Sequence, residues 1–404
     1  MMNSLYFDYC ASTPLHPRAF RTLMDSAKHY FANPSSTHEM GFEASLRVEE
    51  SREQIARLLQ VKATEVIFTS GATESNNLAI LGVVRAWMKR TRRTPHIILS
   101  EIEHSSVYQC GKQLAEEGVE VSFLPVNRSG IVSPVSVKES LQANTILVSV
   151  MHVNNETGAV QPIAEIAELL KSEPQILFHV DGVQGFGKLQ VELDHIDLYT
   201  VSGHKIGGPK GIGLLVAKEH IEMDPLMYGG EQERGIRPGT TNVPAVLSFA
   251  EAIAASNEEQ HEKFRYLMSL HDLVYSGLAA IPGLVMNSPV PPLSSPHIIN
   301  FSYQGRGITS AMMISMLAKQ GIIVSSQSAC SSKAKQSRVL MAMTQDETIS
   351  SSSIRLSLHE TVTQEDAGYL VASIEQMVSQ LKSKNKFDLL QKHHLSSKSE
   401  GITL

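Results

Sequence analysis

Short apolar runs alternate with helical segments along the chain before Gly239. The apolar runs, rich in β-branched residues, cover 66–69, 96–100, 119–124, 145–150, 175–180, 198–202 and 213–217. Segments in which apolar residues recur with helical spacing separate several of these runs, at 44–59, 74–89, 105–117 and 163–172. This alternation predicts an α/β fold in which helices cover both faces of a mostly parallel sheet.

The pattern changes after Gly239. A long helical stretch at 242–278 leads into a proline-rich segment at 281–296, and a less regular series of apolar runs and helical segments follows, at 297–302, 309–320, 322–325, 353–358 and from 364 onward. We expect a large domain over 16–257 and a smaller α+β domain over 258–381, against which residues 1–15 pack. The tail over 382–404, rich in Lys, Ser and His, is expected to be frayed.

Composition and charge exclude several classes of protein. With 404 residues, of which 42% are apolar and 19% charged, the chain can bury a large globular core. A net charge of -6 provides no positive field for nucleic acid or an anionic membrane. Three scattered cysteines suit neither a disulfide framework nor a metal site, and the first ten residues lack the features of an export signal. We therefore expect a cytoplasmic protein that binds no metal, nucleic acid or membrane.

The most informative candidate is Lys205, in the sequence Ser202-Gly-His-Lys205 followed by a glycine-rich turn. A lysine at the end of a strand, with open backbone around it, is placed like one that forms a Schiff base. Ser202 and His204 offer a hydroxyl and an imidazole to an anion such as a phosphate monoester. The alternative is a surface turn that carries a solvated lysine.

A second candidate anion site lies where an apolar run passes into a helix, at Gly71-Ala72-Thr73. Unpaired backbone N–H groups at a helix N-terminus, together with the Thr73 hydroxyl, make a phosphate cradle. Taken alone, the same residues favour a plain capping turn.

Further polar residues follow other predicted strands. Asp181 ends the run 175–180, where ligands bind in open α/β sheets, and its carboxylate suits the protonated ring nitrogen of pyridoxal phosphate. Gln184 offers a hydrogen bond to a cofactor phenolate, and Asn155 offers one to the phenolate or to a substrate carboxylate. The flat ring of His104 can stack on a cofactor and move protons. Each of these residues has a structural alternative, such as a cap or a buried polar contact, so the inference depends on their joint occurrence.

These motifs resemble the cysteine desulfurases of the NifS and IscS type, within the class V, fold-type-I pyridoxal-phosphate enzymes. The resemblance runs from residue 5 to about residue 375, in family order, and some features resemble Bacillus-type NifS variants. The matching stretches are 6–14, 33–38, 68–76, 151–156, Ser202–Lys205, 234–240, Ser328–Cys330 and 353–357. The resemblance implies a large cofactor-binding domain and a smaller α+β domain.

The family implies a role for each matched residue. Lys205 is expected to carry pyridoxal 5'-phosphate, with Asp181 as the partner of its ring nitrogen and His104 stacked on the ring. Arg355 is expected to clamp the substrate carboxylate, assisted by Asn33. Residues expected around the cofactor phenolate are Gln184 and Asn155, and those expected at its phosphate are Gly71, Ala72, Thr73, Ser202, His204 and, from the other subunit of a homodimer, Thr240.

Cys330 resembles the family's sulfur-accepting nucleophile. Its neighbours over 327–337 are small and polar, as in a loop that moves between a cleft and an acceptor, whereas a buried structural cysteine would have apolar neighbours. Lys333 and Lys335 are positioned in sequence to lower the pKa of its thiol. The sequence departs from the family pattern at two places. It has Gly182-Val183 where Ala-Thr is common, and Gln327 where glycine is usual.

The resemblance implies conversion of L-cysteine to L-alanine, with the sulfur left as a persulfide on Cys330 for an acceptor protein. The acceptor stays open among an iron–sulfur cluster scaffold, a tRNA-thiolation enzyme and a dedicated client enzyme. Two alternatives also stay open: another class V reaction, by an aminotransferase or selenocysteine lyase, and a catalytically silent sulfur-relay or interaction partner. Lys205, Asp181, Cys330 and Arg355 together argue against a silent partner.

Overall fold

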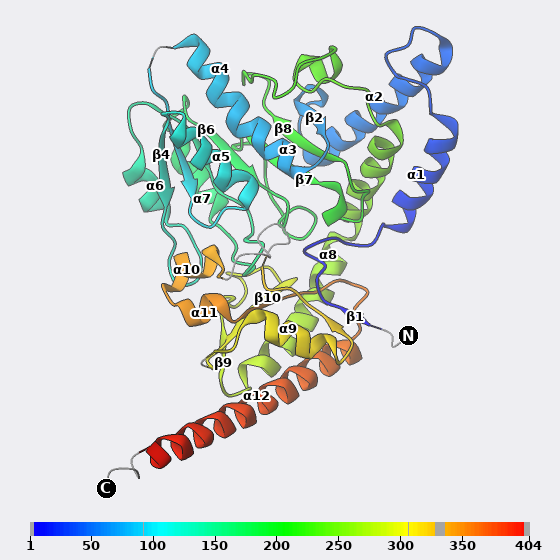
Figure 1. The fold of residues 1–404 in the computed structure, drawn as a ribbon. Helices are drawn as coiled ribbons and strands as arrows, with labels where there is room; N and C mark the ends of the chain where they lie inside the picture. The colour runs from blue at the N-terminus through cyan, green and yellow to red at the C-terminus, as the bar shows by residue number, and fades with distance from the viewer. Residues whose placement is uncertain (1–3, 92, 306, 328–335, 400–404) are drawn as a thin grey trace.

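The computed structural model describes residues 4–91, 93–305, 307–327 and 336–399. A seven-stranded sheet forms its larger part (Figure 1), in the order β2-β8-β7-β6-β5-β3-β4. All neighbouring strands are parallel except at β8, which is antiparallel to both β7 and β2. The predicted α/β fold with a mostly parallel sheet is confirmed. The strands are β2 (Val66–Thr69), β3 (His96–Ser100), β4 (Glu120–Leu124), β5 (Thr145–Ser149), β6 (Leu177–Asp181), β7 (Leu198–Ser202) and β8 (Gly213–Ala217).

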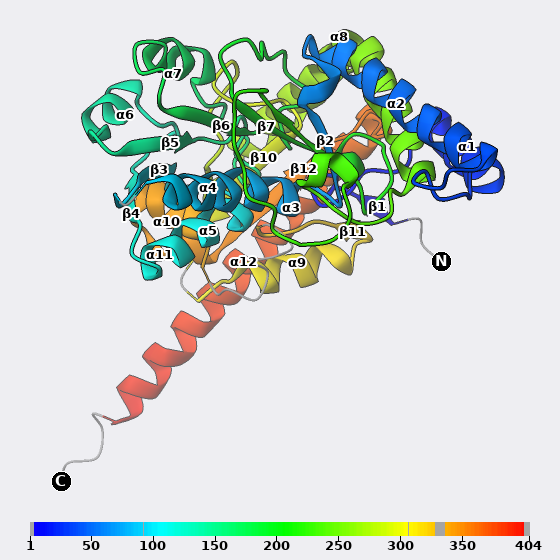
Figure 2. The ribbon, with the colours of Figure 1, turned by 90° about the horizontal axis from the view of Figure 1, so that it is seen from above.

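Helices cover both faces of this sheet, because successive strand residues point to opposite sides. On one face, Phe178 and Val180 belong to a buried cluster with side chains of α2 (Glu39–Leu59), α7 (Ile163–Leu170) and α8 (Val243–Ala279). On the other face, Ile97 and Leu99 pack with the helices that Figure 2 shows over the front of the sheet. Members of this cluster come from the π-helical turn (Leu78–Gly82), α4 (Val83–Arg90) and α5 (Ser105–Glu116), and α3 (Ala72–Asn77) directly precedes the turn.

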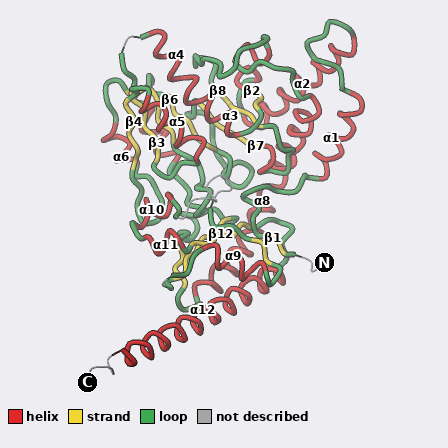
Figure 3. The backbone as a smooth tube through the Cα atoms, viewed as in Figure 1, coloured by secondary structure: helices red, strands yellow, loops and turns green. Residues whose placement is uncertain are grey.

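The C-terminal part forms a second layer below the large sheet, as the strands in Figure 3 show. A three-stranded antiparallel sheet has the order β12-β10-β9, and β11 pairs in parallel with the N-terminal strand β1. Phe7 joins the hydrophobic cluster of this part, so the N-terminal segment packs there. The elements are β1 (Leu5–Tyr6), β9 (Leu284–Met286), β10 (Ile298–Tyr303), α9 (Ser310–Ala318), β11 (Ile322–Ile323), α10 (Arg338–Thr344), α11 (Glu347–Ser351), β12 (Ser353–Ser357) and α12 (Gln364–Ser399).

The last helix differs from the expectation of a frayed tail. The backbone of α12 is helical to Ser399 and extends away from the rest of the molecule in Figures 1 and 2. No glycine or proline occurs between residues 369 and 400 to interrupt it. The remaining helices are α1 (Pro17–His29), α6 (Pro134–Ser140) and three 3-10 turns at Ala63–Glu65, Gly203–Lys205 and Gln232–Gly235. Within the described part of the chain, no helix is both long and apolar enough to span a membrane.

Candidate active site

Lys205 lies at the end of the short turn that follows β7, where the N-terminal segment crosses the large sheet. Its amine donates hydrogen bonds to the main-chain carbonyls of Cys10 and Ala11. The backbone N–H of Thr13 donates to the His204 carbonyl at 3.0 Å, and that of His16 to Gly207 at 2.8 Å. Gly207 has a φ of +81°, and a Cβ there would contact His16, which explains why the turn is glycine-rich. The lysine is therefore held against a second segment of backbone and does not extend into solvent from a surface turn.

A second lysine, which the sequence analysis did not single out, supports the first. Lys188 donates from its side-chain nitrogen to the main-chain carbonyl of Lys205, at 2.9 Å. Burial lowers the pKa of Lys188 to about 8. A glycine-lysine pair six residues after Asp181 was the available signal, but nothing in the sequence showed that its side chain turns toward Lys205.

Asp181 ends β6 and is almost fully buried, at 4% exposure. One of its oxygens accepts a hydrogen bond from the side chain of Asn76 at 2.8 Å, and the other from the Val183 N–H at 3.1 Å. Asn76 also donates to Ser106, whose hydroxyl lies 2.9 Å from His104 Nδ1. A chain of polar contacts thus joins Asp181 to the residue expected to stack on the cofactor.

His104 caps the start of α5, and Nδ1 of its ring accepts from the Ser106 N–H at 3.2 Å. Burial lowers the pKa of His104, with the Asp181 charge opposing this and the cations Lys205, Arg338 and Arg355 adding to it. The imidazole is therefore neutral near pH 7, and because Nδ1 accepts, the proton lies on Nε2. A flat, neutral ring held by its own helix cap suits stacking on a planar cofactor.

The predicted anion cradle occupies the end of β2 and the first turn of α3. Space is open around Gly71, since a Cβ there would meet no atom within 4 Å. Glu74 closes the turn by accepting from the Ser70 N–H at 2.7 Å and pairing with Arg237 at 2.9 Å. Ser202 is buried at the end of β7, while His204 lies in the turn after it, with a pKa lowered to about 4 by burial and by neighbouring lysines.

Arg355 lies on β12 with 2% exposure, so its charge is deeply buried. Its guanidinium donates to the Asn155 carbonyl at 2.9 Å and to the Asp8 carboxylate at 2.7 Å. Its Nε is buried and has no hydrogen-bond partner among the described residues. A buried donor without a partner is costly, and a ligand carboxylate would satisfy it.

The structure does not bring every predicted residue to this place. Asn33 lies on the exposed loop after α1, and its side chain accepts from Ser35 N at 3.0 Å in its own turn. Thr240 is exposed just before α8. Cys330 lies outside the described residues, although the flanks of its segment are described. Arg338, on the following flank, donates to the carbonyls of Glu101 and Glu103 and lies 3.9 Å from the ring centre of Tyr108.

Glu103 is another buried titratable group that the sequence analysis did not select. Its carboxyl group has 0% exposure, and one oxygen accepts from the Ser100 hydroxyl at 2.6 Å and the Met151 N–H at 2.7 Å. The other oxygen has no partner among the described residues. Burial raises the pKa of Glu103 to about 8, and the charge on Asp181 adds to this effect. Glu103 therefore holds a proton at neutral pH.

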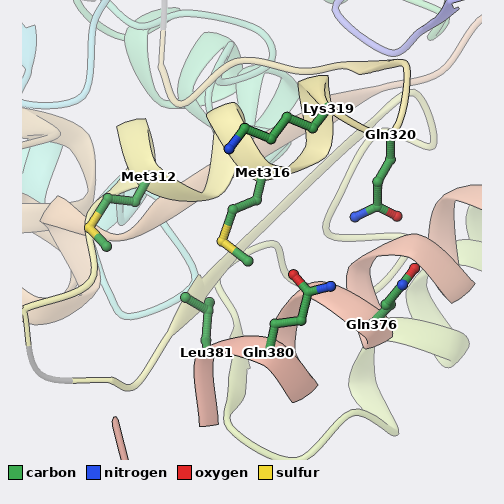
Figure 4. A pocket seen from close by; sticks show the side chains of 7 residues that line it. All are labelled: Met312, Met316, Lys319, Gln320, Gln376, Gln380 and Leu381. Carbon is green, nitrogen blue, oxygen red and sulfur yellow. The ribbon is translucent and has the colours of Figure 1, made fainter. Parts of the chain in front are cut away.

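An open cavity lies elsewhere in the molecule (Figure 4). It has a volume of about 430 Å³, between α9 and α12. Neither helix carries a residue predicted for the site. Its lining consists of Met312, Met316, Lys319, Gln320, Gln376, Gln380 and Leu381.

Comparison with known proteins identifies the family to which this chain belongs. The family model described as aminotransferase class-V matches residues 5–370. The chain belongs to this family. Class-V enzymes of this kind use pyridoxal 5'-phosphate, and the residues present fit the group: an amine, a carboxylate, a neutral ring and an open anion cradle.

Relatives at substantial identity cover most of the chain. The "NifS/IcsS protein homolog" of Lactobacillus delbrueckii subsp. bulgaricus is 40% identical over 377 residues, 92% of this chain and 97% of that protein. The "Putative cysteine desulfurase IscS 1" of Bacillus subtilis is 41% identical over 360 residues, 88% of this chain and 93% of that protein. The resemblance to NifS- and IscS-type proteins, including a Bacillus relative, is confirmed.

Solved structures of similar proteins have the same fold as this chain. A "NIFS-LIKE PROTEIN" has a TM-score of 0.86 and 33% identity, covering 93% of this chain and 99% of its own. A structure described as "SspA in complex with cysteine" has a TM-score of 0.75 and 32% identity, covering 88% of this chain and 98% of its own. The fold expected for this class-V chain is therefore confirmed.

Tyr199 accounts for one departure from the family pattern. The ring of Tyr199, buried on β7, occupies the space beside Gly182, and a Cβ at that position would lie only 2.1 Å from the ring. An alanine there would overlap the ring. Glycine at position 182 therefore leaves room for the Tyr199 ring on the adjacent strand β7.

The proton on Glu103 predicts a pH-dependent stability. Between the ordinary carboxyl pKa and about 8, the folded protein retains a proton that the unfolded chain has released, so this group makes folding less favourable as pH rises. Glu103→Gln, which mimics the protonated form, should gain stability relative to wild type between about pH 5 and about pH 8, by up to ~1.4 kcal/mol per pH unit. Thermal unfolding of both proteins at the two pH values measures the difference.

Glu116→Gln, on the exposed surface of α5, controls for the loss of one carboxylate. An identical stability difference between Glu103→Gln and wild type at both pH values would show that Glu103 titrates normally.

Proposed function

We propose that this chain is a pyridoxal-phosphate-dependent cysteine desulfurase that converts L-cysteine to L-alanine and receives the sulfur as a persulfide on Cys330. The observation that carries the proposal is that one N-terminal segment contacts Lys205 through the Cys10 and Ala11 carbonyls and Arg355 through Asp8, in a chain 37–41% identical to proteins named cysteine desulfurase. The overall reaction is balanced: L-cysteine and a thiol give L-alanine and a persulfide.

Each residue has a task that its contacts support. Lys205 would hold the cofactor, and its amine would accept the proton from the substrate α-carbon. Asp181, fixed by Asn76, would pair with the cofactor's ring nitrogen, and the cofactor would supply an electron sink. Arg355 binds the substrate carboxylate through its unpartnered Nε, with Asn155 beside it. The cofactor's phosphate would be bound by Gly71, Ala72, Thr73, Ser202 and His204.

The other two cysteines are poor nucleophiles, which supports the choice of Cys330. Cys110 is buried on α5, and burial raises the pKa of its thiol to about 12. Burial also raises the pKa of the Cys10 thiol. Both thiols are protonated at neutral pH, and the thiolate is the reactive form. Of the described residues on either side of this segment in the sequence, Gln327 is buried and Arg338 donates to the carbonyl of Glu103, next to His104.

The partners are proposed on the same basis. The sulfur acceptor is a protein that reaches the Cys330 segment, and Thr240 serves the phosphate site of the other subunit in a homodimer. Large apolar side chains are exposed on α1, α2 and the loop between them, which is typical of a surface covered by a partner. They are Phe20, Met24, Phe31, Met40, Phe42 and Leu46.

Lys205→Ala should abolish cofactor retention, because the covalent link needs the side-chain amine. After incubation with pyridoxal phosphate and dialysis, we expect no visible absorbance band and no alanine production from L-cysteine. Lys210→Ala, which removes an exposed lysine of the same turn, should keep both. A wild-type band and normal turnover in Lys205→Ala would contradict the assignment.

Cys330→Ala separates a desulfurase from the alternatives, since an aminotransferase does not need this thiol. L-cysteine should still change the visible spectrum of the variant, while alanine release and persulfide fall to background. Cys110→Ala should retain persulfide formation, because Cys110 packs in the helix core. Mass spectrometry after thiol trapping locates the sulfur. Undiminished alanine release by Cys330→Ala would favour another class V reaction.

Sedimentation velocity tests the homodimer. We expect a species of twice the chain mass, and Phe42→Asp should raise its dissociation constant at least about tenfold, because it places a charge on the apolar surface. Val135→Asp, at an exposed apolar position of α6, is the matched control and should leave the dimer intact. A fully active wild-type monomer would refute the proposal.

A further inference from the structure

A chain of buried hydrogen bonds connects Gln184 to the linker before β10. The Ser295 hydroxyl lies 2.6 Å from His297 Nδ1, and His297 Nε2 lies 3.2 Å from the side-chain oxygen of Gln184. The side-chain nitrogen of Gln184 donates to the Cys10 carbonyl at 3.3 Å. Ser295, His297 and Gln184 have exposures of 0%, 3% and 5%, so water does not compete for these bonds.

The chemistry of the Cys10 carbonyl determines the direction of every bond in this chain. A carbonyl only accepts, so the amide nitrogen of Gln184 must face it, and the amide oxygen must face His297. That oxygen also only accepts, so His297 carries its proton on Nε2. Nδ1 is then an acceptor, and the Ser295 hydroxyl must donate to it.

The surroundings of His297 keep the ring in this single neutral form. Burial, together with the positive charges of Lys188 and Arg355 and the nearby His271, holds the pKa of His297 well below its usual range. The backbone around the ring is also fixed: Ser295 N–H donates to the Gly158 carbonyl at 2.8 Å, and Leu358 N–H to the His297 carbonyl at 2.9 Å.

The Gln184 amide ends this chain next to Lys205. The Cys10 carbonyl that accepts from Gln184 also accepts from the Lys205 amine. The amide nitrogen has two hydrogens, and only one is used by this carbonyl. The second is available to the phenolate oxygen of a cofactor attached to Lys205.

We propose that Ser295 and His297 are positioning residues that lock the Gln184 amide with its N–H, and never its oxygen, toward the cofactor's phenolate oxygen. This inference rests on the proposed function, because it assumes that the cofactor is attached to Lys205. A donor at the phenolate oxygen favours the more negative form of the cofactor and so lowers the pKa of the group joined to Lys205. Without the bonds from Ser295 and His297, the Gln184 amide would no longer be held with its N–H toward the phenolate oxygen, and this hydrogen bond would weaken.

The experiment uses the full-length protein loaded with pyridoxal phosphate and titrates its visible absorbance with pH, without substrate. His297→Leu should raise the midpoint by roughly half a unit to one unit. Ser295→Ala, which removes the donor to Nδ1, should shift it in the same direction by less. In a Gln184→Ala background, His297→Leu should add no further shift, since the effect passes through that amide. His96→Leu, at another buried histidine whose ring contacts Thr145 and Ser122 and none of Ser295, His297 and Gln184, should leave the midpoint unchanged.

An unchanged midpoint in His297→Leu, or a full shift that persists in the Gln184→Ala background, would overturn the inference. If His297→Leu does not fold, the test is made with Ser295→Ala. An unchanged midpoint in Ser295→Ala would likewise overturn the inference. These outcomes differ from failure of the proposed function, which would show as the absence of a visible band in wild type.

Discussion

The amine of Lys205 is held by main-chain carbonyls of the N-terminal segment, and the arrangement of the site depends on this contact. The same segment is fixed to the large sheet through Thr13 and His16, and to the small sheet, where the Ser357 N–H donates to the Phe7 carbonyl at 2.8 Å. Asp8 pairs with Arg355 on the small sheet. One short stretch of backbone therefore connects Lys205, proposed to carry the cofactor, with Arg355, proposed to bind the substrate carboxylate.

Buried charge imposes the second constraint. An ionised group in the interior costs several kcal/mol unless it is paired or well hydrogen-bonded. Arg355 is paired with Asp8, Asp181 is bonded to Asn76 and a backbone N–H, and Glu103 avoids the cost by remaining protonated. The charges that remain at the site are those that a cofactor and an amino-acid substrate would complement.

The two sheets contribute different parts of the chemistry. The carboxyl ends of parallel strands β3, β5, β6 and β7 meet at one edge of the large sheet and supply His104, Asn155, Asp181 and Lys205. The small sheet contributes Arg355, and its linker contributes His297. Contacts such as that of the Asn300 side chain with the Glu156 carbonyl, at 3.0 Å, hold the two parts together at this edge. A site built at such a boundary suits the proposed reaction, in which the thiol of Cys330 would come from another segment of the chain.

The sequence alone determined the α/β class, the order of the strands along the chain and the residues at their ends, because periodicity and strand-end motifs are local features. It also predicted that Lys205, Asp181, His104 and Arg355 act together, through resemblance to a family. Only the tertiary structure revealed Asn76 against Asp181, Asp8 against Arg355 and His297 against Gln184, since these partners are 105, 347 and 113 residues apart. The orientation of a buried amide or the proton on a buried carboxyl depends on every group packed around it, and no local pattern contains that information. The close approach of Gly182, directly after β6, to the ring of Tyr199 on β7 was decided in the same way, by packing between residues distant in the sequence.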